Sequence, residues 1–483
     1  MTTKWSTYQT TIFDFVQNGQ GNAIVKAVAG SGKTTTLVEA VKRAEGTSIF
    51  MAFNKSIQTE LEKRGVNART YHSLCYSPAL KSKGAKTVDM NKLRTLMRKN
   101  FSGIENENYG AFAHKLVGLA RNEGIGCLIE DSDSAWYDIV AHHDLELPNK
   151  DCDMIKAVSI SRKLMDISMK SNLVDFDDLL YTVVKEGLSL QKYDFVFVDE
   201  SQDSNAIQRA ILRMIMKPTS RIIAVGDVSQ AIYGFRGASS NSMDLIKEEF
   251  ACVELPLTIS YRCATSIVNY AKQWNEEIES SPTAPEGSVV DFGEDWSLSN
   301  IQANDLVLCR TNKPLIQLAY RCLVERKPAY IMGKDIGTGM ISHINRMEAV
   351  SIDDLSLALM ENNEREVNKA RAKNQEDKAR AIEDKYEAIM VLINSMGEQN
   401  RTIKHLCEII TSLFESKDNA IVLGSIHKVK GAEYKNVFWL NRSQCPARWV
   451  KQDWQHEQER NLCYVATTRA KENLYLIEEQ KRR

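Results

Sequence analysis

One short glycine-containing segment constrains the fold of this chain more than any other feature. Residues 27–34 read AVAGSGKT, directly after the β-branched pair Ile24 and Val25 and before a segment whose apolar residues have helical spacing. A strand, a turn of small residues and a helix form the layout of a phosphate-binding P-loop. Glycines let backbone N–H groups approach phosphate oxygens, and a helix N-terminus favours negative charge. The alternative is a chance Gly-Ser-rich turn.

The side chains of this segment have separate expected roles. Lys33 can reach the terminal phosphates of a nucleotide, and the hydroxyl of Thr34 can hold Mg²⁺. Ala27 stands where the general pattern has its first glycine, so the strict pattern is not met. The residues expected to contact the nucleotide are Ala29, Gly30, Ser31, Gly32, Lys33, Thr34 and Thr35.

Length and composition exclude several classes of protein. A chain of 483 residues is too long for one ordinary core, so we expect two to four domains. A hydrophobic content of 43%, without an apolar run of membrane-spanning length or an apolar N-terminal signal, predicts a soluble protein without a membrane partner. Ten scattered cysteines without a C-x-x-C pair argue against a zinc site or disulfide frame and for a reducing compartment. We therefore expect a cytoplasmic protein, located in the host cytoplasm if it is viral.

Two carboxylates follow a second apolar segment. The four residues 195–198 read FVFV and predict a buried strand that ends at Asp199 and Glu200. Asp199 can hold Mg²⁺ through water, and Glu200 can accept a proton from an attacking water. An acidic strand-to-loop turn is the alternative, and the P-loop upstream makes it the weaker one.

A third strand, at residues 221–225, precedes the sequence GDVSQAIYGFRG. A glutamine just beyond the carboxyl end of a strand can contact a γ-phosphate, which makes Gln230 a candidate. Tyr233 and Phe235 can stack on bases. Taken alone, these two aromatic residues would be interpreted as core.

The rest of the chain gives weaker patterns. Residues 8–16 predict a helix, residues 48–53 a strand, residues 70–73 an ordinary strand end, and residues 75–173 a helical, irregular region. The polar segment 361–385 predicts an exposed helix or arm, and the apolar stripe after it predicts packing rather than partner binding. Further strands are predicted at residues 306–310, 420–425, 437–440 and 474–477.

Three motifs make the chain resemble the UvrD/Rep-type superfamily 1 DNA helicases. They are GDVSQAIYGFRGA at residues 226–238, SIHKVKGAEY at 425–434 and ERNLCYVATTRA at 459–470. The resemblance implies an α/β fold with two RecA-like P-loop motor domains, each a parallel sheet flanked by helices and carrying a mainly helical insertion. The implied boundaries are 1–75 and 174–255 for the first motor domain, 76–173 for its insertion, 256–340 and 418–483 for the second motor domain, and 341–417 for a reduced insertion.

The resemblance also implies roles for individual residues. Gln9 would contact adenine, Tyr261 would stack on it, and Glu433 would contact the ribose. Arg262 and Arg469 would serve as arginine fingers, for which surface salt bridges are the alternative. The residues expected along the path of single-stranded DNA are Phe53, Asn54, His72, Tyr233, Phe235, Arg236 and His427.

The chain departs from the family pattern at several positions. Thr35 stands where the family often has Arg, Phe235 where it often has Trp, and Ser260 where it often has Asn. The insertion at 341–417 is shorter than is usual in the family. The change at Thr35 puts one nucleotide contact in doubt, and Phe235 offers a smaller stacking surface than Trp. The shorter insertion affects the parts that would regulate unwinding.

The activity implied by the resemblance is that of an ATP- and Mg²⁺-dependent DNA helicase that translocates 3′ to 5′. A monomer is expected to act on single-stranded DNA and single-strand/duplex junctions, with replication or repair proteins as further partners. Two alternatives remain open at this point. One is a translocase that displaces proteins with little unwinding, and the other is a nucleotide-gated DNA clamp with vestigial hydrolysis. A net charge of −1 means that DNA would bind in a local channel rather than to a generally basic surface.

Overall fold

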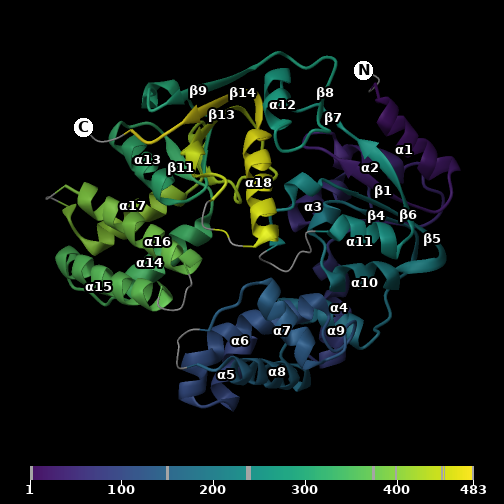
Figure 1. Ribbon diagram of the computed structural model, residues 1–483, viewed down its shortest axis with the longest axis horizontal. Helices are drawn as coiled ribbons and strands as arrows, with labels where there is room; N and C mark the ends of the chain where they lie inside the picture. The colour runs from purple at the N-terminus through teal and green to yellow at the C-terminus, as the bar shows by residue number, and fades with distance from the viewer. Residues whose placement is uncertain are drawn as a thin grey trace. The chain divides into compact units, whose positions relative to one another are not determined.

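The chain divides into two compact units, Met1–Thr258 and Ile259–Arg483. The computed structural model describes residues 4–147, 152–234, 241–371, 376–397, 400–447, 450 and 452–480 (Figure 1). None of the helices in that part of the chain has the length and apolarity that a membrane span needs.

The described residues of the first unit form a six-stranded parallel sheet with the order β3-β2-β4-β5-β1-β6. Its strands are β1 (Asn22–Ala27), β2 (Ser48–Met51), β3 (Ala68–Arg69), β4 (Tyr193–Val198), β5 (Met216–Gly226) and β6 (Cys252–Leu257). The carboxyl ends of β4, β5 and β1 are therefore neighbours along one edge of the sheet, which is where open parallel sheets bind ligands.

Both faces of this sheet are covered by helices. Successive strand residues such as Ile24 and Val25 point to opposite faces, and each joins a different cluster of buried apolar side chains. One face packs on α1 (Thr7–Asn18), α2 (Lys33–Val41) and α3 (Lys55–Lys63). The other face packs on α4 (Tyr71–Lys83), α9 (Phe176–Lys185), α10 (Ala206–Met214) and α11 (Ser242–Glu249).

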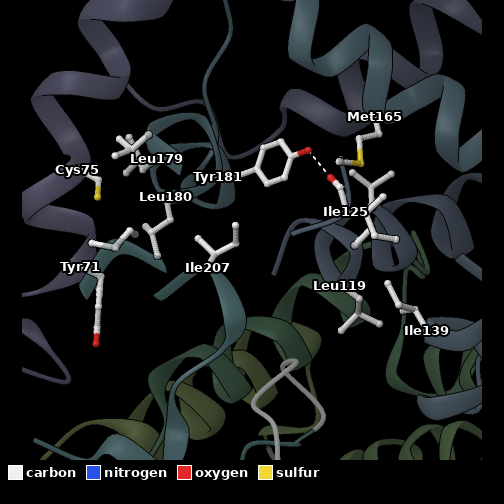
Figure 2. Packing of buried hydrophobic residues seen from close by; sticks show 14 of the residues in the cluster. Tyr71, Cys75, Leu119, Ile125, Ile139, Met165, Leu179, Leu180, Tyr181 and Ile207 are labelled. Carbon is white, nitrogen blue, oxygen red and sulfur yellow. Dashed lines mark hydrogen bonds between the residues drawn. The ribbon is translucent and has the colours of Figure 1, made fainter. Parts of the chain in front are cut away.

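A group of helices extends the second of these clusters away from the sheet (Figure 1). Tyr181 of α9 donates a 2.5 Å hydrogen bond to the carbonyl of Ile125, and buried side chains such as Leu119, Ile139 and Met165 continue the same core (Figure 2). The region predicted as helical and irregular is thus one packed body. Its helices are α5 (Lys92–Asn100), α6 (Gly103–Glu123), α7 (Asp133–His142) and α8 (Met154–Lys170).

The described residues of the second unit form another six-stranded parallel sheet, with the order β11-β12-β10-β13-β14-β9. A short parallel pair, β7 (Ile259–Ser260) and β8 (Glu279–Ser280), accompanies it. The strands of the main sheet are β9 (Ser288–Gly293), β10 (Leu306–Cys309), β11 (Ala329–Ile331), β12 (Ile421–Ser425), β13 (Tyr434–Leu440) and β14 (Ala470–Ile477).

Two groups of helices pack on this second sheet. Helices α12 (Thr265–Ala271) and α18 (Asp453–Thr467) contact β14 and each other. The other group shares one buried cluster with β10, β12 and β13. Its members are α13 (Lys313–Val324), α14 (Lys334–Asn345), α15 (Ile352–Arg371), α16 (Glu376–Ser395) and α17 (Ile403–Phe414).

The polar segment 361–385 differs from the expected exposed helix or arm. It contains the end of α15 and the start of α16, which pack on each other, while residues 372–375 lie outside the described part. Val367, Ala370 and Ala379 are buried between the two helices. Because most residues around them are charged, the sequence pattern did not indicate this apolar contact. The stripe after this segment does pack, because Ile389 and Ile393 are buried in the core of the second unit.

The predicted fold class is confirmed: two α/β domains carry parallel sheets flanked by helices, as in RecA-like motor domains with helical insertions. The domain boundaries given above stay a prediction.

Candidate nucleotide and nucleic-acid site

The P-loop follows β1 and turns into α2 through two glycines with left-handed backbone. Gly30 has a φ of 74° and Gly32 a φ of 78°, values that residues with a Cβ rarely adopt. The hydroxyl of Ser31 donates to the carbonyl of Val28 at 2.9 Å and so fixes the turn. Lys33 begins α2 and is buried, as is Ala29, while the side chain of Thr35 is exposed.

Thr34 and Asp199, the two residues predicted to hold a metal, are in direct contact. The Thr34 hydroxyl donates to Oδ2 of Asp199 at 2.6 Å, although the two residues lie 165 positions apart. Asp199 is the first residue after β4 and is buried. Burial and then the adjacent charge of Glu200 raise the pKa of Asp199 to about 6, against the opposing effects of Thr34 and Lys33.

These residues fit Mg²⁺ bound together with phosphates. A hydroxyl oxygen and a carboxylate oxygen within hydrogen-bonding distance of each other are hard donors, the kind of ligand that Mg²⁺ prefers. Among the residues that the structure describes, no cluster of three or more His, Cys, Asp or Glu side chains could hold a metal by itself.

Glu200 has an unusual backbone. Its φ of 52° and ψ of 41° lie in the left-handed region, which costs a residue with a Cβ on the order of 1 kcal/mol or more. Its N–H donates to Oδ1 of Asp199 at 2.9 Å, and Oε2 of Glu200 accepts from the Gln202 amide at 2.5 Å. The turn thus directs Asp199 and Glu200 to different partners.

Gln9 lies beside the P-loop. Its amide nitrogen donates to the hydroxyl of Thr36 at 3.0 Å, and its oxygen accepts from the N–H of Ser6, the N-cap of α1. A Cβ on Gly32 would be 3.7 Å from the same amide nitrogen. The predicted adenine contact is therefore held at the P-loop by α1.

The carboxyl end of β5 adds two buried polar residues. Gln230 donates through its amide to Oδ2 of Asp227 at 2.7 Å, and the N–H of Ser229 donates to the other carboxylate oxygen at 3.1 Å. Burial raises the pKa of Asp227 to about 6, while the charge of Lys33 opposes this shift. Gln230 thus follows the strand that neighbours the one preceding Asp199, at the same edge of the sheet.

Two aromatic pairs lie near the predicted path of DNA. The rings of Phe53 and Tyr233 are stacked, with centroids 6.0 Å apart and planes at 14°. His72 makes an edge contact with the exposed ring of Phe176 at 5.6 Å, and burial lowers the pKa of His72, which favours the neutral imidazole. Asn54 accepts from the N–H of Ile57 and caps α3. The predictions for Phe235 and Arg236 lie outside the described residues.

In the second unit, Arg262 and Glu433 form a cluster with their neighbours. The guanidinium of Arg262 donates to Glu433 at 2.6 Å and to the carbonyl of Thr468 at 3.2 Å. Lys471 contacts the other oxygen of Glu433 at 2.7 Å. Burial acts to raise the pKa of Glu433, but the bonds and charges of Lys471 and Arg262 hold this pKa below its ordinary value. Tyr261, the predicted adenine stacker, is exposed beside this cluster.

Arg469 lies next to Thr468 but is buried. Its guanidinium donates to the carbonyl of Val465 at 3.0 Å and to that of Ala432 at 3.1 Å. These bonds hold the end of α18 on the loop that carries Glu433. The arginine-finger role stays a prediction for both Arg262 and Arg469. His427 is half-buried after β12, and its predicted contact with DNA also stays a prediction.

Four residues of the site had no role assigned from the sequence. Asp227 follows a strand directly, as Asp199 does. The rule that polar residues just after a buried strand are site candidates, called the strand-end rule below, could therefore have identified it. Thr36 and Gln202 are recognised only through partners distant in sequence, Gln9 and Asp227. Phe176 is the first residue of α9, and its ring is exposed beside His72.

Comparison with known proteins gives two family matches. Residues 51–251 match the UvrD/REP helicase N-terminal domain, and residues 420–477 match the UvrD-like helicase C-terminal domain. The first match begins after the P-loop, so the nucleotide site is identified by its own residues and geometry.

Several curated proteins are similar to the chain. DNA helicase II of Haemophilus influenzae is 25% identical over 290 residues, which cover 52% of this chain and 38% of that protein. A probable DNA helicase II homolog of Mycoplasma pneumoniae is 23% identical, with 95% of this chain and 82% of that protein covered. The Gabija protein GajB of Bacillus cereus is 24% identical, with 96% and 94% covered.

The chain spans 38% of the length of the Haemophilus protein, but 82% and 94% of the lengths of the other two. The two matched domains nevertheless occur in family order and together cover more than half of the chain. They coincide with the motifs that surround the strand ends described above. The chain belongs to the UvrD/Rep-type superfamily 1 helicases.

Proposed function

We propose that this protein is an ATP-dependent DNA helicase and translocase that moves 3′ to 5′ on single-stranded DNA. The observation that carries the proposal is the hydrogen bond of Thr34 to Asp199, with Lys33 and Glu200 adjacent to this pair in the chain. Phosphoryl transfer depends mainly on positioning and on charge stabilisation, and these residue types supply both. The direction of movement rests on the family alone.

The chemistry assigns one task to each group. Lys33 and the N–H groups of the P-loop bind the phosphates, and Gln230 contacts the γ-phosphate. Mg²⁺, held by Thr34 and Asp199, would neutralise charge on the phosphate oxygens. Glu200 orients a water and accepts its proton. Arg262 and Arg469 supply positive charge to the transferring phosphoryl group, an effect worth about 10³- to 10⁵-fold in related enzymes.

Stacking explains how the same molecule would hold DNA. Aromatic rings bind any base at about 1–3 kcal/mol each, so we expect low sequence specificity. Phe53 of this stacked pair follows β2, and Tyr233 follows β5, the strand that also precedes Gln230. A nucleotide-dependent change at the end of β5 would thus alter the hold on a base.

Steady-state ATP hydrolysis with and without single-stranded DNA tests the proposal, followed by unwinding of duplexes with 3′ or 5′ tails. We expect hydrolysis that DNA stimulates and unwinding that requires a 3′ tail. Hydrolysis without stimulation by DNA would contradict the DNA assignment. Absence of hydrolysis would favour the nucleotide-gated clamp.

A second candidate is a translocase that displaces proteins but unwinds little. The short helical region from α14 to α17 supports it, because larger insertions in the family regulate unwinding. Displacement of streptavidin from biotinylated single-stranded DNA, measured beside duplex unwinding, separates the two candidates.

A further inference from the structure

We propose that Gln202 is a positioning residue that holds the carboxylate of Glu200 against the carboxyl end of β5. The inference rests on the proposed function, because it assumes that Glu200 acts on water during ATP hydrolysis. It concerns a side chain that contacts neither phosphate nor metal in the scheme above.

The amide of Gln202 is engaged at both ends. Its nitrogen donates to Oε2 of Glu200 at 2.5 Å, and its oxygen accepts from the backbone N–H of Asp227 at 3.0 Å. A backbone N–H can only donate, so the amide oxygen must face Asp227 and the NH₂ group must face Glu200. The amide supplies the donor to Glu200 and the acceptor for Asp227 from one side chain, which is 2% exposed.

The backbone at Gly226 and at Glu200 determines where the amide of Gln202 lies. A Cβ on Gly226 would come within 2.6 Å of the Gln202 amide oxygen and within 2.7 Å of both Met243 and Ser201. Glycine at the end of β5 is thus what allows the glutamine side chain to cross the strand end. The left-handed backbone of Glu200, with a φ of 52°, brings its carboxylate back towards Gln202.

The same contact connects two strand ends. Glu200 and Gln202 follow β4, whereas Asp227, which Gln202 holds by its N–H, follows β5 and accepts from Gln230. Gln202 therefore joins the proposed base to the residue that holds the proposed γ-phosphate contact. Substitution of Gln202 would therefore let the carboxylate of Glu200 move away from the end of β5, while the proposed phosphate contacts would stay intact.

Two variants separate the functions of the amide. Gln202→Met keeps the length of the side chain but removes both hydrogen bonds, and Gln202→Glu keeps an acceptor for Asp227 while losing the donor to Glu200. In both we expect kcat for DNA-stimulated ATP hydrolysis to fall about 10- to 100-fold, the range seen for residues that orient reacting groups. The KM for ATP and the binding of a non-hydrolysable ATP analogue should stay within about twofold, because the phosphate contacts remain.

Gln58→Met is the matched control. Gln58 is also a buried glutamine of the first unit, and its amide donates to Glu62 at 2.7 Å. We expect it to keep its kcat. Gly226→Ala is a second variant that leaves the glutamine unchanged: its added Cβ would crowd the amide oxygen of Gln202 together with Met243 and Ser201, and in a folded protein it should lower kcat in the same way.

A double-mutant cycle with Glu200→Gln decides whether Gln202 acts through Glu200. If it does, Gln202→Met lowers kcat in the wild type but has no further effect in the Glu200→Gln background. Equal losses in both backgrounds, or a kcat within twofold of wild type in a folded Gln202→Met protein, would overturn the inference. Absence of DNA-stimulated hydrolysis in the wild type would instead overturn the proposed function.

Discussion

At the residue scale, the site depends on how one cation, Lys33, faces two buried carboxylates. Lys33 is buried at the start of α2, and its charge opposes the rise in pKa of both Asp199 and Asp227. Its side chain therefore has two expected functions, contact with phosphate and compensation of the carboxylates at the ends of β4 and β5. Removing it should affect the nucleotide site more than the fold.

Lys33→Ala tests the nucleotide site directly. We expect ATP turnover to fall by at least about 10²- to 10³-fold, because a preorganised positive charge at the phosphates is lost. Lys42→Ala is the control, because Lys42 lies at the end of the same helix and forms an exposed pair with Glu39. Near-normal turnover of Lys33→Ala in a steady-state ATPase assay would refute the assignment.

Glu200→Gln separates binding from hydrolysis. Glutamine has nearly the same shape but cannot accept a proton, so ATP should still bind while hydrolysis slows by about 10²- to 10⁴-fold. Equilibrium binding of labelled ATP and a single-turnover measurement check the two parts. A fast Glu200→Gln enzyme would remove Glu200 from the role of base.

At the element scale, the sequence predicted the strands that carry chemistry better than the edges of the sheets. Residues 195–198 and 221–225 lie within β4 and β5, and the strand-end rule located Asp199 and Glu200 correctly relative to these strands. The edge strand β6 was not predicted, because Pro256 in its sequence speaks against a central strand and is tolerated at an edge. The strand end expected at residues 70–73 is also the start of α4, where Thr70 and Ser73 form a capping box.

What the sequence could not supply was the pairing of distant elements. Gln202 contacts Asp227 across 25 positions, and Gln9 contacts Thr36 across 27. These contacts depend on how helices and strands distant in the sequence pack together, which no local sequence pattern encodes. The same holds for the buried ion cluster between the insertion and α9.

This cluster should stabilise the first unit. Arg121 donates to both oxygens of Asp175 at 2.9 and 3.0 Å, and Asp178 contacts Lys92 at 2.5 Å, with nearly all of these side chains buried. Arg121→Ala would remove the ion-pair partner of the largely buried Asp175 and leave Asp178 with Lys92 alone. We expect a loss of about 3–5 kcal/mol in the free energy of unfolding, measured by urea denaturation.

Lys170→Ala is the control for this change, because Lys170 pairs with Asp166 on the exposed surface of α8. Loss of this surface pair should lower the free energy of unfolding by less than about 0.5 kcal/mol. Equal midpoints for the two variants would show that the buried cluster does not hold the insertion helices on α9.

At the scale of the whole molecule, the proposed chemistry is divided between the two units. The P-loop, metal and base residues belong to the first unit, and Arg262, Glu433 and Arg469 belong to the second. Each unit has its own parallel sheet and core, so each can keep its fold when the other is altered. Under the proposed function, neither unit hydrolyses ATP alone.

Arg262 offers a clean test of this division. Arg469 is buried and bonded to the carbonyls of Val465 and Ala432, so its removal would also disturb the second unit. Arg262 is partly exposed and bonded to Glu433 and to one carbonyl, so Arg262→Ala should leave the fold intact. We expect kcat for ATP hydrolysis to fall by about 10³-fold or more while ATP binding to the first unit persists.

The matched control is Arg401→Ala, because Arg401 forms a surface pair with Asp353 in the same unit. Single-turnover hydrolysis and ATP binding should both stay normal in this variant. If Arg262→Ala lost ATP binding but kept its kcat at saturation, Arg262 would bind the ground-state nucleotide rather than the transition state. If it lost neither, the second unit would contribute no charge through Arg262, and the division of the chemistry between the two units would have to rest on Arg469 alone.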